Sequence, residues 1–127
     1  MKSKSFTSNC VTFQNADGVV MVGFADDEFN TNEYVLLQRT LQPDEQDRSL
    51  GLDGVHLQVD SPDQSGYDCI KRIRVTRSEI QIELKPEAQS AFPCRDVQIT
   101  FNMDDEHYSR MLAHLKEVVD ERATLTV

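Results

Sequence analysis

Helical periodicity is confined to one stretch of this 127-residue chain, near its C-terminal end. After Asp104, which can cap a first helical turn, apolar side chains recur every three or four residues and so share one helix face. These are Tyr108, Met111, Leu112, Leu115, Val118 and Val119. The pattern predicts a helix that runs to about Ala123 and whose apolar face must be covered by another element.

The rest of the chain has the composition and alternation of β-strands. Short apolar or alternating segments bounded by turn residues predict strands over residues 6–13, 19–24, 34–40, 55–60, 69–75, 78–84 and 97–103. Two of these segments, 19–24 and 34–40, are apolar on both faces, which is typical of strands that are covered on both sides. We therefore predict an α+β, mostly β fold, an antiparallel sheet of about seven strands packed by one C-terminal α-helix.

The connections between the strands carry recognisable turn residues. The segment 15–18 predicts a hairpin between the first two strands, and Pro43 ends the third because proline has no N–H for a ladder. Residues 43–50 are compatible with a helical turn, and 86–93 with either a loop or a short helical turn. Residues 61–66 are predicted to form a loop.

The length predicts a single domain over residues 1–127, large enough to bury a core without metal or disulfide support. Its three cysteines, Cys10, Cys69 and Cys94, are odd in number and lack Cys-x-x-Cys spacing, which argues against a disulfide framework and a zinc site. The N-terminal residues are polar, without the apolar segment of a signal peptide, and no segment approaches the length of a membrane span. We expect a cytoplasmic protein.

The net charge of −9 is concentrated in one half of the chain. Residues 17–68 hold twelve acidic residues against two basic ones, Arg39 and Arg48, and so carry −10, whereas the rest of the chain carries +1. Such a field repels nucleic acid and anionic membranes and speeds encounter with a basic partner. We therefore expect no nucleic-acid or membrane partner. The alternative is that the acidity serves only solubility.

The acidic residues are densest in the two connections on either side of segment 34–40. We predict that six carboxylates in these connections bind a partner, namely Asp26, Asp27, Glu28, Asp44, Glu45 and Asp47. The alternative role is support of the fold, because a short acidic turn can cap and orient the backbone.

The first connection also suggests an alternative function. Asp26, Asp27, Glu28, Asn30 and Asn32 offer oxygen ligands of the kind that calcium accepts, although the Asp-x-Asp-x-Asp-Gly order of a calcium loop is absent. A small-ligand or calcium-binding β module that uses the acidic loops is therefore the alternative to a protein-binding function.

No catalytic set stands out in the sequence. The histidines His56, His107 and His114 are not paired with a nucleophile, and there is neither a Gly-x-Ser-x-Gly turn nor a glycine-rich phosphate loop. We therefore predict no catalytic residues, no metal, no cofactor and no enzymatic activity.

Basic residues gather on one predicted hairpin, at Lys71, Arg72, Arg74 and Arg77. Only Tyr67 is near enough in sequence to supply a stacking aromatic, so a nucleic-acid site is not expected. The alternatives are a solvated strand face and a contact with the acidic half, within the chain or in a dimer.

A series of motifs between residues 20 and 84 resembles a known family. The series consists of Phe24-Ala25-Asp26-Asp27-Glu28-Phe29-Asn30, Tyr34 with Leu37-Gln38-Arg39, Asp44-Glu45-Gln46-Asp47, Gly51-Leu52-Asp53-Gly54, and Ser65-Gly66-Tyr67 followed by Ile70. It resembles the immunity protein 10 family of bacterial polymorphic-toxin systems. Asp68-Cys69 stands where the family's pattern has Gly-Gly.

The resemblance implies a mostly β protein that is encoded beside a toxin and protects the producing cell by binding it. We therefore expect an immunity protein that neutralises a cognate toxin by stoichiometric non-covalent inhibition. If that toxin is a basic nuclease, the acidic side chains could stand in for the phosphates of its substrate. The oligomeric state is left open, with a homodimer as one alternative.

Overall fold

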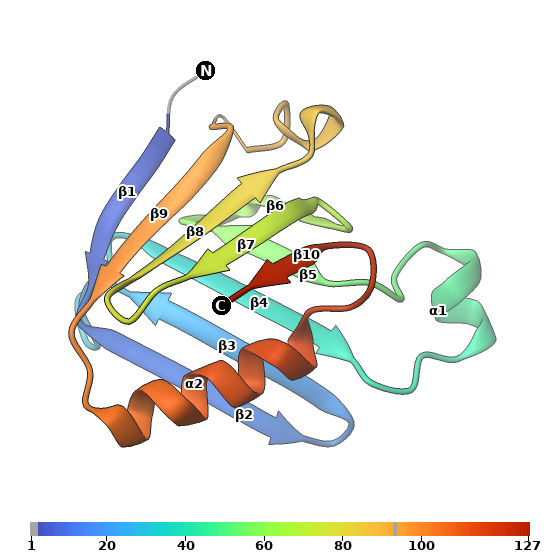
Figure 1. The fold of residues 1–127 in the computed structure, drawn as a ribbon. Helices are drawn as coiled ribbons and strands as arrows, with labels where there is room; N and C mark the ends of the chain where they lie inside the picture. Colours follow the sequence, from blue (N-terminus) through green and yellow to red (C-terminus); the bar gives the residue numbers. More distant parts are fainter. Residues whose placement is uncertain (1–2, 93) are drawn as a thin grey trace.

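The chain forms two five-stranded sheets and one long helix (Figure 1). The computed structural model describes residues 3–92 and 94–127. Sheet A has the order β1 (Ser3–Ser8), β9 (Asp96–Phe101), β8 (Glu79–Leu84), β7 (Ile70–Val75) and β10 (Thr124–Thr126). Sheet B has the order β2 (Cys10–Ala16), β3 (Val19–Ala25), β4 (Tyr34–Thr40), β5 (His56–Val59) and β6 (Ser61–Tyr67).

Sheet B is a meander in which each strand pairs antiparallel with the next one along the chain. The predicted hairpin is present, and its turn places Asp17 and Gly18 at φ values of 56° and 76°. Two consecutive positive φ angles twist a two-residue turn in the same sense as the strands it joins. The acidic residues 17–68 therefore lie in the strands and connections of sheet B.

Sheet A is antiparallel in its centre and parallel at its edges. Strands β7, β8 and β9 form antiparallel neighbours, whereas β1 lies parallel to β9 and β10 parallel to β7. The two chain ends thus supply the two edge strands of sheet A (Figure 1).

One apolar core lies between the two sheets and beneath helix α2 (Asp105–Val118). Alternation places Ile80, Ile82 and Leu84 of β8 in that core, as the sequence predicts. The α2 side chains Met111 and Leu115 are fully buried, and the helix packs mainly on β2 and β3 (Figure 1). The inner face of sheet B is thus covered partly by sheet A and partly by α2.

The predicted fold class is confirmed, but the strands are more numerous and divided between two sheets. Residues 6–13 do not form one strand, because the chain changes sheets at Asn9, whose N–H donates to the Ala25 carbonyl at 2.9 Å. Residues 61–66 are not a loop. They belong to β6, an edge strand, where a proline such as Pro62 is tolerated.

The C-terminal helix is shorter than predicted. It ends at Val118 because Val119 is extended, and the following residues turn back to form β10, which the sequence analysis missed. The helical turn expected in residues 43–50 is present as α1 (Glu45–Ser49), and residues 86–93 contain the 3₁₀ turn η1 (Pro86–Ala88). Neither these helices nor α2 is long and apolar enough to cross a membrane.

The packing of α2 on sheet B can be tested at its centre. We expect Leu115→Ala to lower the free energy of unfolding by about 3 kcal/mol, because it opens a cavity beneath the helix. Lys116→Ala, on the exposed side of the same turn, should change it by less than about 0.5 kcal/mol. Urea denaturation measures both. A cost below about 1 kcal/mol for Leu115→Ala would contradict this packing.

Candidate partner-binding site

The first acidic connection, residues 26–33, is held by its own carboxylates. The Asp26 N–H donates to the Glu33 carbonyl at 3.0 Å, and Asp26 Oδ1 accepts from the amides of Asn32 and Glu33 at 3.0 and 3.1 Å. The Glu33 amide, with help from the Asn32 amide, holds the pKa of the Asp26 carboxyl below its usual value of 3.8. Asp26 therefore closes the base of this connection.

Asp27 organises the tip of the same connection. Its Oδ1 accepts from the amides of Phe29 and Asn30, both at 2.9 Å, and its carbonyl accepts from the Thr31 hydroxyl at 2.6 Å. These bonds leave the Phe29 ring 91% exposed. The neighbouring Glu28 is also exposed and has no hydrogen bond or ion pair among the described residues.

The second acidic connection contains a helix cap. Asp44 Oδ1 accepts from the Asp47 amide at 2.7 Å, and Asp47 Oδ2 accepts from the Asp44 amide at 3.2 Å, which makes a reciprocal capping box around α1. Glu45 is exposed in the first turn of α1 and pairs with no described residue. Of the six predicted residues, Asp26, Asp27, Asp44 and Asp47 thus support the backbone, whereas Glu28 and Glu45 present free carboxylates.

The structure does not bring the two groups of carboxylates together. Residues 26–28 precede β4 and residues 44–47 follow it, so the groups lie beyond opposite ends of that seven-residue strand. A strand of this length spans about 20 Å. A single compact site that contains all six residues is therefore excluded, and one partner would have to contact both ends of β4.

The outward face of sheet B has no charged side chain on β2 to β5. Strand pairing and burial place these outward residues together: Cys10, Thr12, Gln14, Ala16, Val19, Met21, Gly23, Ala25, Tyr34, Leu36, Gln38, Thr40, His56 and Gln58. Burial lowers the pKa of His56, so its ring is neutral at pH 7. The acidic residues of sheet B lie in its connections and, as Asp63, on the edge strand β6, around this uncharged face.

A hollow of about 210 Å³ lies on this outward face. Gly23 lines it, with Thr12 on one neighbouring strand and Tyr34 and Leu36 on the other, and Thr31 of the 26–33 connection lines it too. A Cβ atom on Gly23 would lie 2.9 Å from Thr12 Oγ1 and 3.4 Å from Leu36 Cδ1. The glycine therefore allows the neighbouring side chains to approach closely over the strand.

The outward face of sheet A is different in kind. Its strand positions carry only polar side chains, such as Thr7, Gln81, Glu83, Gln98 and Arg72. Within the basic cluster on this sheet, Lys71 and Arg72 lie 3.7 and 3.9 Å from Glu83, while Arg77 contacts Asp105 at 2.8 Å. These ion pairs remain in the sheet A half of the chain and do not reach the acidic half.

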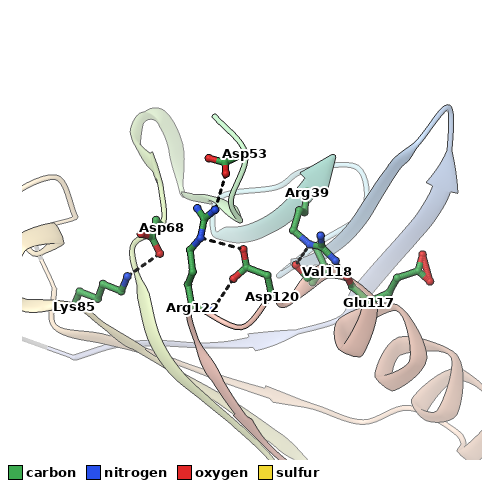
Figure 2. Close-up of polar contacts among 8 residues, drawn as sticks. All are labelled: Arg39, Asp53, Asp68, Lys85, Glu117, Val118, Asp120 and Arg122. Atoms are coloured by element: carbon green, nitrogen blue, oxygen red, sulfur yellow. Dashed lines mark hydrogen bonds and ion pairs between the residues drawn. The ribbon is translucent and has the colours of Figure 1, made fainter. Parts of the chain in front are cut away.

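A second polar network fixes the C-terminal segment against sheet B (Figure 2). Arg39 of β4 donates to the carbonyls of Glu117 and Val118 at 2.5 and 3.0 Å and so satisfies the end of α2. Arg122 then pairs with Asp53 at 2.6 Å and lies against Gly54, where a Cβ atom would be 2.7 Å from its guanidinium. The Gly51-Leu52-Asp53-Gly54 motif thus forms the binding site for the Arg122 side chain. The sequence alone did not predict this role.

The turn at Asp68 accommodates the departure from the family's Gly-Gly. Asp68 adopts a φ of 57°, a conformation that glycine reaches more easily than other residues. Its carboxylate is bound by Lys85 at 2.7 Å (Figure 2), and the following Cys69 is buried. The turn therefore accommodates the side chains of both Asp68 and Cys69.

A groove at the N-terminus of α2 brings together Cys10, Glu28, Asp104 and His107. Burial, followed by the charges of Glu28 and Asp27, raises the pKa of the Cys10 thiol, which disfavours the thiolate that a nucleophile requires. Asp104 accepts from the His107 amide at 2.8 Å, so this pair forms a helix cap. The Cys10 thiol is therefore not activated as a nucleophile.

The fold and this surface define a class: a two-sheet β protein with one long helix and an acidic sheet whose outward face is uncharged on β2 to β5. The family model for immunity protein 10 matches residues 7–109, so the chain belongs to the immunity protein 10 family. Membership implies an immunity protein that acts against a toxin. No curated protein matches the sequence.

The role of Asp26 predicts a pH dependence. Because its pKa is lower in the folded protein than in the unfolded chain, its contribution to stability is complete above about pH 4 and is lost as the pH falls through the lowered value. We expect the amide resonances of Asn32 and Glu33 to titrate with a midpoint below 3.8. In Asp26→Asn this transition should disappear; its persistence would contradict the assignment.

The calcium alternative can be tested separately. Among residues 3–92 and 94–127, no group of three or more His, Cys, Asp or Glu side chains is arranged to hold a metal ion, and Asp26 and Asp27 already accept hydrogen bonds. We expect calorimetry with calcium to give no binding heat and thermal denaturation to show no shift. Saturable heat that Asp27→Asn removes would revive the calcium-binding function.

Proposed function

We propose that this protein binds its cognate toxin with one-to-one stoichiometry and inhibits it without covalent chemistry and without enzymatic activity of its own. The observation that supports the proposal is the distribution of charge. The strands and connections of residues 17–68 carry −10, they form most of sheet B, and the rest of the chain carries +1. A molecule with one strongly acidic side accelerates its encounter with a basic partner and orients it.

The free carboxylates are the parts of this acidic side available to a partner. Glu28 and Glu45 are exposed and pair with no described residue, so a basic side chain could bind either of them without breaking an existing contact. Asp26, Asp27, Asp44 and Asp47 already accept backbone hydrogen bonds, and they hold Glu28 and Glu45 in position. If the toxin is a nuclease, these carboxylates take the place of substrate phosphates in its basic active site.

The proposal places the protein in the cytoplasm of the toxin-producing cell, where a toxin must be neutralised before export. Co-expression of the toxin domain encoded beside this gene provides the direct test. Cells should survive with this protein and die with an empty vector. Death in both cases, with both proteins present and folded, would contradict the function.

The acidic side can be tested by charge reversal. We expect Glu28→Lys/Glu45→Lys to lower the association rate constant for the toxin about tenfold at low salt, and less at high salt where charges are screened. Glu87→Lys/Glu121→Lys makes the same change in net charge at exposed positions outside residues 17–68 and should lower the rate less than threefold. Stopped-flow or surface binding measures both. Equal losses in the two pairs would show that only net charge matters.

A further inference from the structure

The uncovered face of sheet B contradicts an expectation from its own sequence. Segments 19–24 and 34–40 are apolar on both faces, typical of strands that are covered on both sides. In the structure α2 and sheet A lie on the inner face, and no helix or strand of the described chain packs on the outer one. Met21 and Leu36 therefore remain partly exposed.

Sheet A provides the internal comparison. Its outward strand positions carry only polar side chains. Polar side chains are typical of a sheet face that is exposed to solvent. The outward face of sheet B instead carries Val19, Met21, Ala25 and Leu36, and the last two of these line the Gly23 hollow. Apolar side chains gathered on one face and rimmed by polar residues mark interaction sites on soluble proteins.

We infer that the outward face of sheet B is the surface on which the toxin docks, with an apolar side chain of the toxin seated in the Gly23 hollow and basic toxin residues on the surrounding acidic connections. This inference rests on the proposed function and adds the location of the interface. An uncharged centre with a charged rim is the arrangement found in protein interfaces, whose cores are depleted of charged residues.

The charge around the outward face of sheet B favours the toxin over a second copy of this chain as its partner. Two copies that met through this face would bring two regions of −10 against each other, and like charges across an interface cost several kcal/mol. A basic partner removes that cost and gains from the acidic rim. The face therefore fits a basic protein better than it fits itself.

The strands of this face are too small to form a stable interface without the acidic connections beside them. Strands β2, β3 and β4 are each about 20 Å long, and the four-residue β5 is about 13 Å long. At a spacing of about 4.8 Å they present roughly 350 Å² of sheet, less than half of what one partner contributes to a stable interface. The 26–33 connection, which reaches the hollow through Thr31, and the connection that contains α1 lie at the two ends of β4 and extend the surface. In this arrangement the two groups of carboxylates lie at opposite edges of one interface.

Single arginine substitutions test the centre of the face. Thr12→Arg, at an exposed wall of the hollow, and Leu36→Arg, at a partly exposed one, should each weaken the dissociation constant for the purified toxin domain at least tenfold. Thr100→Arg and Gln81→Arg place the same side chain on the outward face of sheet A and should stay within about twofold of the wild type. Circular dichroism confirms that each variant is folded. Folded Thr12→Arg and Leu36→Arg variants that bind like the wild type would overturn the inference.

A second measurement does not depend on substitution of a packed residue. A benzoylphenylalanine photo-crosslinker at position 12 should attach to the toxin domain, and the same group at position 100 should not. Wild-type binding without a crosslink from position 12 overturns the docking face and leaves the proposed function standing, whereas absence of wild-type binding removes the proposed function itself. Sedimentation of the free protein should show a monomer; a dimer that Thr12→Arg separates would assign the face to a second copy instead.

Discussion

Sheet B has an apolar inner face and, on β2 to β5, an uncharged outer face with apolar side chains at its middle, and the described chain covers only the inner one. The inner face is closed by sheet A and by α2, which buries Met111, Leu115 and Val118. Among residues 3–92 and 94–127, no helix or strand covers the outer face, where Gly23, Thr12 and Leu36 line a hollow. Burying apolar surface is the main source of stability in folding and in association alike. Apolar side chains that stay exposed in the monomer therefore favour association with a partner that buries them.

Two arginines hold the covered side in place. Arg39 satisfies the last carbonyls of α2, and Arg122 fastens the segment after the helix to the loop at Asp53 (Figure 2). The family match ends at residue 109, so most of α2 and the whole of β10 lie outside the matched range. Yet these elements complete the core and one edge of sheet A. Arg39 and Asp53, from the motifs at residues 37–39 and 51–54, contact this C-terminal segment directly.

The sequence was sufficient for the fold class and for the elements with strong periodicity. Strand β8 buries Ile80, Ile82 and Leu84, and helix α2 buries Met111 and Leu115. Each element buries one face, and this produces the period that the sequence shows. The errors fall where the local signal is weak. The change of sheet at Asn9 depends on a bond to distant Ala25, and β10 is three residues long with mostly exposed side chains.

The candidate site was only partly predictable, because charge shows where acids lie in the sequence and not what they bond to. Asp26, Asp27, Asp44 and Asp47 cap backbone, and only the structure separates them from Glu28 and Glu45. The apolar face had a signal in the sequence, namely Val35-Leu36-Leu37, which indicates burial on both sides. The same pattern is typical of a strand in the core. In the structure Leu36 faces outward, on the face where we infer that the toxin docks.

The most direct test of a toxin-covered sheet B is the solvent exposure of the Met21 methyl group in the free and the bound protein. Met21 lies outward on β3, whereas Met111 is fully buried on the inner side of α2. With methyl-labelled methionine and a soluble gadolinium chelate, the Met21 resonance should broaden in the free protein and be protected once the toxin domain binds, while Met111 stays sharp in both states. A Met21 methyl that broadens equally in the complex would contradict the account.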